Sequence, residues 1–327
     1  LAQNNLDQFG PRTFGISKTE TGFLLGTLIF GVGVGSLLAG YWSDGKVELG
    51  IVPLGAIGII LSSLAAWLSG MLFTPGIPAT QQWMYYCGIG SLFLLGTSAG
   101  LYNVPLESYL QFRSDPRTRG TVLSGSYFLS FSMGIVAAIF LKVLLSCGLA
   151  SREVFLVSGL LTIPVTAYLL YLLPDLTFRF LLWLLTHTLY RLKVVGRENI
   201  PDKGGALIVA NHVSFMDGIL MMVSTSRLAR FLVFADFTEM WGLRSLAKLM
   251  KVIPIRSTDG PKAILKALQT AREAIINGEV VVIFAEGQLT RTGQMQPFAR
   301  GMLKIVDGTG APIVPAYLHG MWGSIFS

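Results

Sequence analysis

The sequence has little charge and few cysteines. Only 13% of its 327 residues are charged, whereas 52% are hydrophobic, so a protein that is soluble along its whole length is not expected. The two cysteines, Cys87 and Cys147, lie in or beside apolar runs and form no CxxC pair or Cys/His cluster. Without such a cluster, neither a bound metal ion nor a redox centre nor a resident cofactor is predicted.

Three familiar signals are also absent. No GxSxG nucleophile elbow occurs and neither cysteine is near a usable histidine, so a covalent acyl-enzyme is not indicated. Aromatic and basic residues do not interleave as in nucleic-acid-binding proteins, and the formal charge of +7 suits anionic lipid headgroups better. Residues 1–15 lack the basic start and apolar core of a secretory signal, and the chain is expected to begin inside a larger protein.

Long apolar runs fill the first half of the chain. A helix needs roughly 20 apolar residues to cross about 30 Å of hydrocarbon. Five stretches satisfy this condition: 22–42, 51–72, 86–104, 121–146 and 153–173. Their small residues would let helices pack closely; among them are Gly31, Gly33, Gly35 and Gly40. A bundle of about five transmembrane helices is therefore predicted for residues 1–174, in preference to the buried helical core of a soluble domain.

The charges of the loops predict an orientation. Arg113, Arg117 and Arg119 fall in one loop, whereas residues 73–85 contain no Lys or Arg. Because cytoplasmic loops carry an excess of positive charge, the arginine loop is assigned to the cytoplasm. Alternation then places everything after Pro174 in the cytoplasm as well.

A different kind of helix is expected at residues 175–193. Arg179 and Arg191 are too close together for the apolar stretch between them to cross a bilayer. An amphipathic helix in the lipid interface is predicted, with Phe, Leu and Trp side chains in the acyl boundary and basic side chains on phosphates. A buried helix of the following domain is the alternative.

From about residue 194, short β-rich runs alternate with helical segments. The runs are 206–210, 231–235, 252–255, 279–285 and 312–318, and a helix that ends at Gly278 is expected from 261 onward. This order predicts an α/β domain with a mostly parallel sheet over residues 194–327, which we expect to be incomplete. The chain as a whole is thus multi-domain.

The clearest chemical signal is NHVSFMDG, residues 211–218, directly after the first predicted strand. His212 and Asp217 would diverge by about 140° on one helix, so they are expected to straddle a loop and a helix start. With Ser214 as N-cap, Asp217 could turn back to the imidazole, fix its tautomer and leave the other nitrogen as a general base. A plain capping box formed by Ser214 and Asp217 is the alternative.

Polar residues also follow the later strands. Arg256 ends one β-rich run, and Glu286, Gly287 and Arg291 follow another. Because the carboxyl ends of parallel strands converge, Arg256, Arg291 and Lys304 are candidates for binding an acceptor phosphate. Glu286 and Gly287 would shape the turn or hold an arginine. For each arginine the alternative is a solvated surface charge. Backbone N–H groups near the helix start are candidates for stabilising an oxyanion.

Residues from about 190 to 327 resemble the glycerophospholipid acyltransferase family in four motifs. The matching residues are His212 and Asp217 in the first, Arg256 in the second, Glu286 and Gly287 in the third, and Ile313, Val314 and Pro315 in the fourth.

The resemblance implies acyl transfer from acyl carrier protein or acyl-coenzyme A to a lysophospholipid or glycerol phosphate. It implies catalysis by His212 and Asp217, and substrate binding by the residues of the second and third motifs. The sequence departs from the family where Ala285 stands in place of the usual proline, and where Thr290 and Arg291 come later than usual after the Glu-Gly pair.

Residues 1–174 look like the C-terminal part of a major facilitator transporter. The segment from Gly40 through Asp44 to Lys46 resembles a short cytoplasmic loop of that superfamily, although the usual closing arginines are missing. Asp44 would fix the closed cytoplasmic side by bonding to a neighbouring helix end; a solvated loop charge is the alternative. The combination is similar to bacterial inner-membrane fusions that import 2-acylglycerophosphoethanolamine and reacylate it in the cytoplasm.

The leading expectation is therefore an acyltransferase attached to a phospholipid membrane. Its expected partners are a lysophospholipid and acyl carrier protein or acyl-coenzyme A, with no nucleic acid. Two alternatives remain open: a lysophospholipid transporter or flippase with a non-catalytic cytoplasmic domain, and a lysophosphatidic acid acyltransferase.

Overall fold

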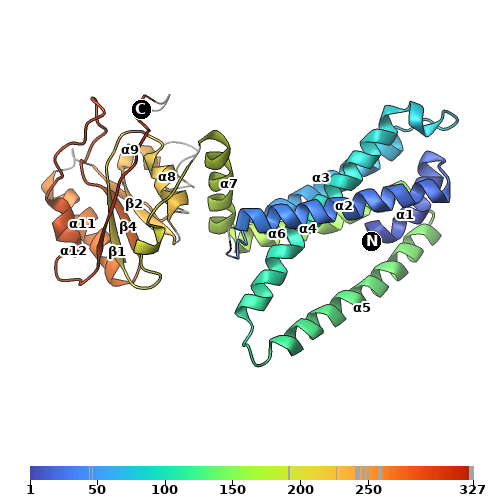
Figure 1. Cartoon of the computed structure of the whole chain (residues 1–327), viewed down its shortest axis with the longest axis horizontal. Coiled ribbons are helices and arrows are strands. Elements are labelled where there is room, and N and C mark those ends of the chain that lie inside the picture. The colour runs from blue at the N-terminus through green and yellow to red at the C-terminus, as the bar shows by residue number, and fades with distance from the viewer. Residues whose placement is uncertain are drawn as a thin grey trace. The chain divides into compact units, whose positions relative to one another are not determined.

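The computed structural model describes residues 1–323 except for 44, 46, 191, 226, 240–243, 245–246, 249 and 257–259. The chain divides into two units, Leu1–Phe180 and Leu181–Ser327, so the division falls inside a helix that follows Pro174. Figure 1 shows an all-helical unit and an α/β unit.

The first unit is built from long apolar helices. A short helix, α1 (Ala2–Phe9), and a π-helical turn (Gly10–Phe14) precede them. In the part of the chain that the structure describes, five helices are long and apolar enough to cross a membrane: α2 (Lys18–Ser43), α3 (Ile51–Met71), α4 (Trp83–Arg113), α5 (Arg119–Ser146) and α6 (Ser151–Leu172). The prediction of five such helices is confirmed, whereas their insertion in a membrane and their orientation stay predictions.

Glycines set the contact between α2 and α4. A Cβ on Gly35 would lie 2.0 Å from the Thr97 carbonyl oxygen, and a Cβ on Gly96 would lie 2.1 Å from the Leu28 carbonyl oxygen. Gly31 and Gly100 meet backbone atoms of the facing helix in the same way. Two Gly-x-x-x-Gly pairs therefore interlock, because only a residue without a side chain allows the backbones to come so close.

Two of the four glycines singled out in α2 do not take part in this packing. No atom lies within 4 Å of a Cβ built on Gly33 or Gly40. Gly40 also belongs to the last helical turn of α2 and not to the loop predicted there, because the helix continues to Ser43. Asp44, the other residue assigned to that loop, lies outside the described residues.

Aromatic rings close one end of the helical unit. Phe9 and Phe14 meet edge to face at 5.1 Å between ring centroids, and Phe155 from α6 meets Phe9 at 4.7 Å. Tyr85 of α4 also packs edge to face on Phe14. By contrast, α5 buries only Leu141 and stands apart from its neighbours in Figure 1. The packed part of this unit is thus formed by the other helices.

Helix α7 (Pro174–Leu189) covers most of the segment predicted to be an interfacial helix. Leu181, Leu185 and Leu189 are 44%, 46% and 65% exposed and recur every fourth residue. This spacing places them on one face of the helix. The exposed apolar stripe agrees with the amphipathic helix that we predicted, and its place in a lipid interface stays a prediction.

The second unit contains a five-stranded, fully parallel sheet in the order β3-β2-β4-β1-β5. Its strands are β1 (Ala206–Ala210), β2 (Ala229–Phe234), β3 (Ile253–Ile255), β4 (Val280–Phe284) and β5 (Ile313–Ala316). All five predicted strands are present, and the mostly parallel sheet is confirmed. All five residues of β1 are buried, as expected for a strand covered on both faces.

Helices cover both faces of the sheet. On one face, α11 (Pro261–Ile276) and α12 (Gly301–Val306) contribute Leu268, Ala271 and Ile305 to a core with Leu207 and Val281. On the other face lie α8 (Asp217–Ser224) and α9 (Ala235–Glu239) (Figure 1). Helix α11 ends as predicted, with Gly278 in the left-handed region at φ 83°.

The glycine contact between α2 and α4 can be tested with two matched substitutions. We expect Gly35→Ala to destabilise the helical unit by about 1–3 kcal/mol, because its methyl group would overlap a carbonyl oxygen and push the helices apart. Gly33→Ala, on the open side of the same helix, should be neutral. Thermal unfolding of the detergent-solubilised chain measures both, and equal midpoints would contradict the interlocked packing.

Candidate active site

The neighbouring strands β1 and β4 place their following residues side by side. In the register of the sheet, Ala210 at the end of β1 pairs with Phe284 at the end of β4. The segments that begin at Asn211 and Ala285 therefore leave the sheet at the same edge. This edge, the carboxyl end of a parallel sheet, is where open α/β proteins bind ligands.

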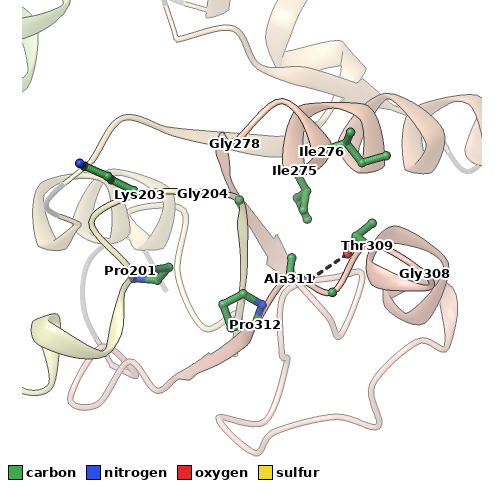
Figure 2. Close-up of a pocket in the computed structure, with 12 residues that line it drawn as sticks. Pro201, Lys203, Gly204, Ile275, Ile276, Gly278, Gly308, Thr309, Ala311 and Pro312 are labelled. Atoms are coloured by element: carbon green, nitrogen blue, oxygen red, sulfur yellow. Dashed lines mark hydrogen bonds between the residues drawn. The ribbon is translucent and has the colours of Figure 1, made fainter.

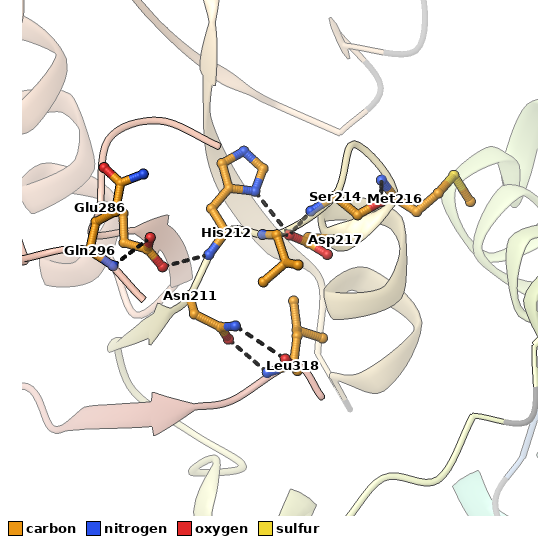
Figure 3. Close-up of polar contacts among 9 residues, drawn as sticks. Asn211, His212, Ser214, Met216, Asp217, Glu286, Gln296 and Leu318 are labelled. Carbon is orange, nitrogen blue, oxygen red and sulfur yellow. Dashed lines mark hydrogen bonds and ion pairs between the residues drawn. The ribbon is translucent and has the colours of Figure 1, made fainter. Parts of the chain in front are cut away.

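His212 and Asp217 are in direct contact there (Figure 3). His212 Nδ1 lies 3.0 Å from Asp217 Oδ2, and the Asp217 side chain is fully buried whereas that of His212 is 22% exposed. A carboxylate can only accept, so Nδ1 carries the proton and Nε2 is left with its lone pair. The pairing expected from the five-residue spacing is therefore present, and it leaves a basic nitrogen at the edge of the sheet.

Asp217 holds the loop as well as the ring. Its Oδ2 also accepts the backbone N–H of Val213 at 2.6 Å and that of Ser214 at 2.8 Å. Three donors thus converge on one carboxylate oxygen and stabilise its charge, as charge-assisted hydrogen bonds do. The imidazole and the loop that carries it are fixed by the same atom.

The helix after this loop begins later than we expected. Helix α8 starts at Asp217 with Met216 as its N-cap residue, and no side chain caps it. Ser214 was predicted to be the N-cap, which is wrong: its Oγ accepts the N–H of Met216 at 3.2 Å within the preceding turn. The reason is that the Asp217 N–H donates to the Ser214 oxygen three residues earlier, so residues 214–217 form a turn and the α-helical bonds begin after it.

The imidazole of His212 is supported on one face by an aromatic ring. The rings of His212 and Phe284 are stacked at 4.2 Å with an interplanar angle of 14°. Phe284 is the last residue of β4, so the neighbouring strand fixes the plane of the imidazole. An apolar neighbour of this kind excludes water from one side of the base.

Glu286 connects two distant backbone segments. Its Oε1 accepts the N–H of His212 at 2.9 Å, and its Oε2 accepts the N–H of Gln296, also at 2.9 Å. The residue is 8% exposed. Of the two roles expected for Glu286, shaping the turn is the one that these contacts match, since both oxygens are occupied by the backbone. Its assignment to substrate binding stays a prediction.

Two residues that the sequence analysis did not single out for this edge also fix the histidine loop. Asn211 exchanges two hydrogen bonds with the backbone of Leu318: its Nδ2 donates to the Leu318 oxygen at 3.1 Å, and its Oδ1 accepts the Leu318 N–H at 2.7 Å. The Thr290 N–H donates to the His212 oxygen at 3.0 Å. The position of Asn211 directly after a buried strand was the available signal for its role.

The predicted phosphate-binding residues are spread along the edge. Arg256 follows β3, three strands from β1 and thus about 14 Å away along the sheet. Its Nε donates to Asp236 Oδ1 at 3.1 Å. Arg291 is exposed and, among the described residues, has no hydrogen-bond or ion-pair partner, and Lys304 is exposed on α12. Their roles toward a phosphate stay predictions.

Gly287 provides the turn after Glu286. It has φ 73°, a left-handed conformation that favours glycine, and its N–H donates to the Phe284 oxygen at 3.0 Å. The turn directs the chain away from the sheet directly after the buried carboxylate. Gly287 therefore allows the backbone to turn here, and its substrate-binding role stays a prediction.

The backbone donors expected to stabilise an oxyanion are largely occupied. The N–H groups of Val213 and Ser214 bind Asp217, and that of Met216 binds Ser214 Oγ. The N–H of Asp217 donates to the Ser214 oxygen at 3.1 Å. None of these four N–H groups is therefore free to bind a substrate oxygen in this conformation.

A hollow of about 570 Å³ lies at the opposite edge, where the strands begin (Figure 2). Lys203, Gly278, Thr309 and Pro312 are among its lining residues. Thr309 Oγ1 is occupied, since it accepts the Ala311 N–H at 3.2 Å and donates to the Val306 oxygen. The hollow offers no acid–base pair, so the candidate site is the edge that carries His212.

Known proteins resemble this part of the chain. Residues 191–319 match the acyltransferase family model. A chloroplastic 1-acyl-sn-glycerol-3-phosphate acyltransferase of Brassica napus is 29% identical over 136 residues, which are 40% of this chain and 38% of that protein. A 1-acyl-sn-glycerol-3-phosphate acyltransferase of Pseudomonas aeruginosa is 34% identical over 144 residues, which are 42% of this chain and 53% of that protein.

A solved structure, the 1-acyl-sn-glycerophosphate acyltransferase PlsC of Thermotoga maritima, is 27% identical and covers 41% of this chain and 52% of that chain, with a TM-score of 0.34. The chain thus spans less than two thirds of the length of these relatives. The matched segment contains the complete set of site residues described above. The family match and these relatives support the predicted enzyme of the O-acyltransferase class in this segment.

The bridge made by Glu286 can be tested by Glu286→Gln. The substituted amide would place a donor against a backbone N–H, so we expect a cost of about 1–3 kcal/mol for the buried donor left without an acceptor. Hydrogen–deuterium exchange should quicken in residues 211–214 and 290–299 and stay unchanged in α11. Glu273→Gln, an exposed control, should leave all three regions unchanged. Unaltered exchange around His212 in Glu286→Gln would show that the bridge is dispensable.

Proposed function

We propose that the α/β unit transfers an acyl group from a thioester to the free hydroxyl of a lysophospholipid of the 1-acylglycerol 3-phosphate type. The observation that carries the proposal is the His212–Asp217 pair, with Nδ1 held by a buried carboxylate and Nε2 left basic. The names of the relatives support the reaction and the acceptor class. Acyl carrier protein and acyl-coenzyme A are the two donors considered.

The geometry suits direct transfer without a covalent acyl-enzyme. His212 Nε2 removes the proton of the acceptor hydroxyl as its oxygen attacks the thioester carbonyl carbon. The C–S bond then breaks, the ester forms, and the leaving thiolate takes the proton back from the imidazolium. Asp217 stabilises the positive charge of the imidazolium during transfer and keeps the ring in one tautomer.

The identity of the acceptor separates two versions of this proposal. The transporter resemblance of residues 1–174 implies 2-acylglycerophosphoethanolamine, whereas the relatives' names give 1-acyl-sn-glycerol 3-phosphate. A phosphate monoester carries more charge than a phosphodiester, and the exposed Arg291 and Lys304 suit the more charged group. We therefore place lysophosphatidic acid first among the acceptors.

A transporter role for residues 1–174 is a separate proposal that the acyl-transfer proposal does not require. It is supported by the five apolar helices. Its location in a bacterial inner membrane, with the α/β unit in the cytoplasm, belongs to the same proposal. Uptake of labelled lysophospholipid into vesicles that contain the chain would test it, with loss of uptake in Asp44→Asn as the expected result.

Acyl transfer can be tested with the purified full chain and two substitutions in the pair. We expect His212→Ala to abolish transfer, and Asp217→Asn to lower its rate by roughly 10³–10⁴-fold, because the amide no longer fixes the tautomer or stabilises the imidazolium. Product formation is measured with lysophosphatidic acid and 2-acylglycerophosphoethanolamine, each with both thioester donors.

Asp202→Asn serves as the matched control, since Asp202 is exposed in the loop before β1 and should leave the rate unchanged. Thermal unfolding of each variant separates lost chemistry from lost folding. Full activity of correctly folded His212→Ala would refute the proposal. Faster reaction of 2-acylglycerophosphoethanolamine than of lysophosphatidic acid would reverse the order of acceptors.

A further inference from the structure

We propose that an apolar rim beside His212, formed by Phe215, Met295, Phe298 and Trp322, inserts into the surface of an anionic lipid bilayer. These four side chains are 60%, 60%, 40% and 50% exposed. The inference rests on the proposed function in one respect, since a lipid acceptor gives the site a reason to face a bilayer. It adds which surface of the α/β unit makes that contact.

The four residues belong to segments that meet at the histidine loop. Phe215 lies within that loop, between residues whose N–H groups are bound inside it. Met295 and Phe298 lie in the loop after β4, which is tied to His212 through Thr290. Trp322 lies on this same loop, because a Cβ on Gly293 would be 2.7 Å from its ring.

The loop after β4 is ordered by its polar groups, and large apolar side chains are left outside. The Ala299 N–H returns to the Ala285 oxygen at 2.7 Å and closes the loop. Within it, Gln288 Nε2 donates to Gln296 Oε1 at 2.7 Å, and Thr290 Oγ1 donates to the Gln294 oxygen at 2.7 Å. A loop held in this way presents its apolar side chains at fixed positions, as a membrane-inserting loop requires.

The positive charge of this region favours an anionic lipid surface as the partner. Residues 287–306 contain Arg291, Arg300 and Lys304 and no Asp or Glu. All three basic side chains are exposed. Apolar and aromatic side chains flanked by basic ones are the composition of interfacial segments that bind anionic headgroups.

The connection of the chain favours a bilayer over a soluble protein partner. The last membrane-length helix ends at Leu172, and the α/β unit begins at Leu181. So short a connection holds the α/β unit close to any bilayer that receives the helices. The segment that follows α7 is joined to the histidine loop, since Tyr190 and Leu192 pack against the buried cluster of Val213, Leu220 and Met321.

Site-specific fluorescence in reconstituted vesicles tests the rim. Met295→Cys is labelled with a polarity-sensitive dye in a full chain whose Cys87 and Cys147 are serine, and the vesicles contain phosphatidylcholine, phosphatidylglycerol and a lipid with a nitroxide on its acyl chain. We expect the nitroxide to remove about half of the signal or more, since the label would lie in the acyl boundary. Ile276→Cys is the matched control: it is 62% exposed, but it lies beside the beginning of the strands.

The expected result is strong quenching at position 295 and little at position 276. Equal quenching at both positions, or none at 295, would overturn the proposal. A change at 295 that requires acyl carrier protein and is absent with lipid alone would also overturn it, in favour of a protein partner. Quenching at position 295 should persist in His212→Ala, because that substitution removes only acyl transfer. In the chain with His212 intact, quenching without acyl transfer would refute only the proposed function. Acyl transfer without quenching would refute only the rim.

Discussion

The pairing of β1 with β4 is the constraint on which the rest of the α/β unit depends. These strands are far apart in the sequence, and their register brings Ala210 beside Phe284. Three contacts of the site follow from this: the stacking of the His212 ring on Phe284, the bond from the His212 N–H to Glu286, and the bond from the Thr290 N–H to the His212 oxygen. A one-residue shift in this register would turn the side chains of one strand to the opposite face of the sheet.

Two carboxylates fix the histidine from different sides. Asp217 holds the imidazole and the following backbone, and Glu286 holds the preceding backbone, so that both the position and the tautomer of the base are set before substrate arrives. Both carboxylates are buried, and both use backbone N–H groups as donors. Preorganisation of this kind lowers the reorganisation needed during proton transfer.

The helical unit follows a different physical rule. For apolar helices that lie in lipid, as we predict for this unit, the hydrophobic effect does not drive association, and close packing of the backbones becomes more important. Gly35 and Gly96 allow that approach between α2 and α4. In the α/β unit, by contrast, the sheet and α11 exclude water from a shared core. The chain thus joins two units whose stability has different origins.

The proposed apolar rim belongs to the α/β unit but would contact lipid, as the predicted transmembrane helices would. Phe215 and Met295 are each 60% exposed, in the histidine loop and in the loop that is hydrogen-bonded to it, and the exposed Arg291 and Arg300 flank Met295 in the sequence. The loop that carries Met295 is held by Glu286, which accepts the Gln296 N–H, and by Thr290, which donates to the Gln294 oxygen. At a bilayer, the same surface would bring the acceptor lipid to His212.

The sequence by itself determined the five apolar helices, the five strands and the pairing of His212 with Asp217, because these depend on local hydrophobic pattern and short spacing. It did not determine that Gly33 and Gly40 face away from the helix contact, that α8 begins at Asp217, or that Glu286 binds backbone and Arg256 binds Asp236. Apart from the start of α8, which local hydrogen bonds within residues 213–217 set, those outcomes depend on which residues distant in the chain become neighbours. Only the helix packing and the strand order, set by long-range contacts, could decide them.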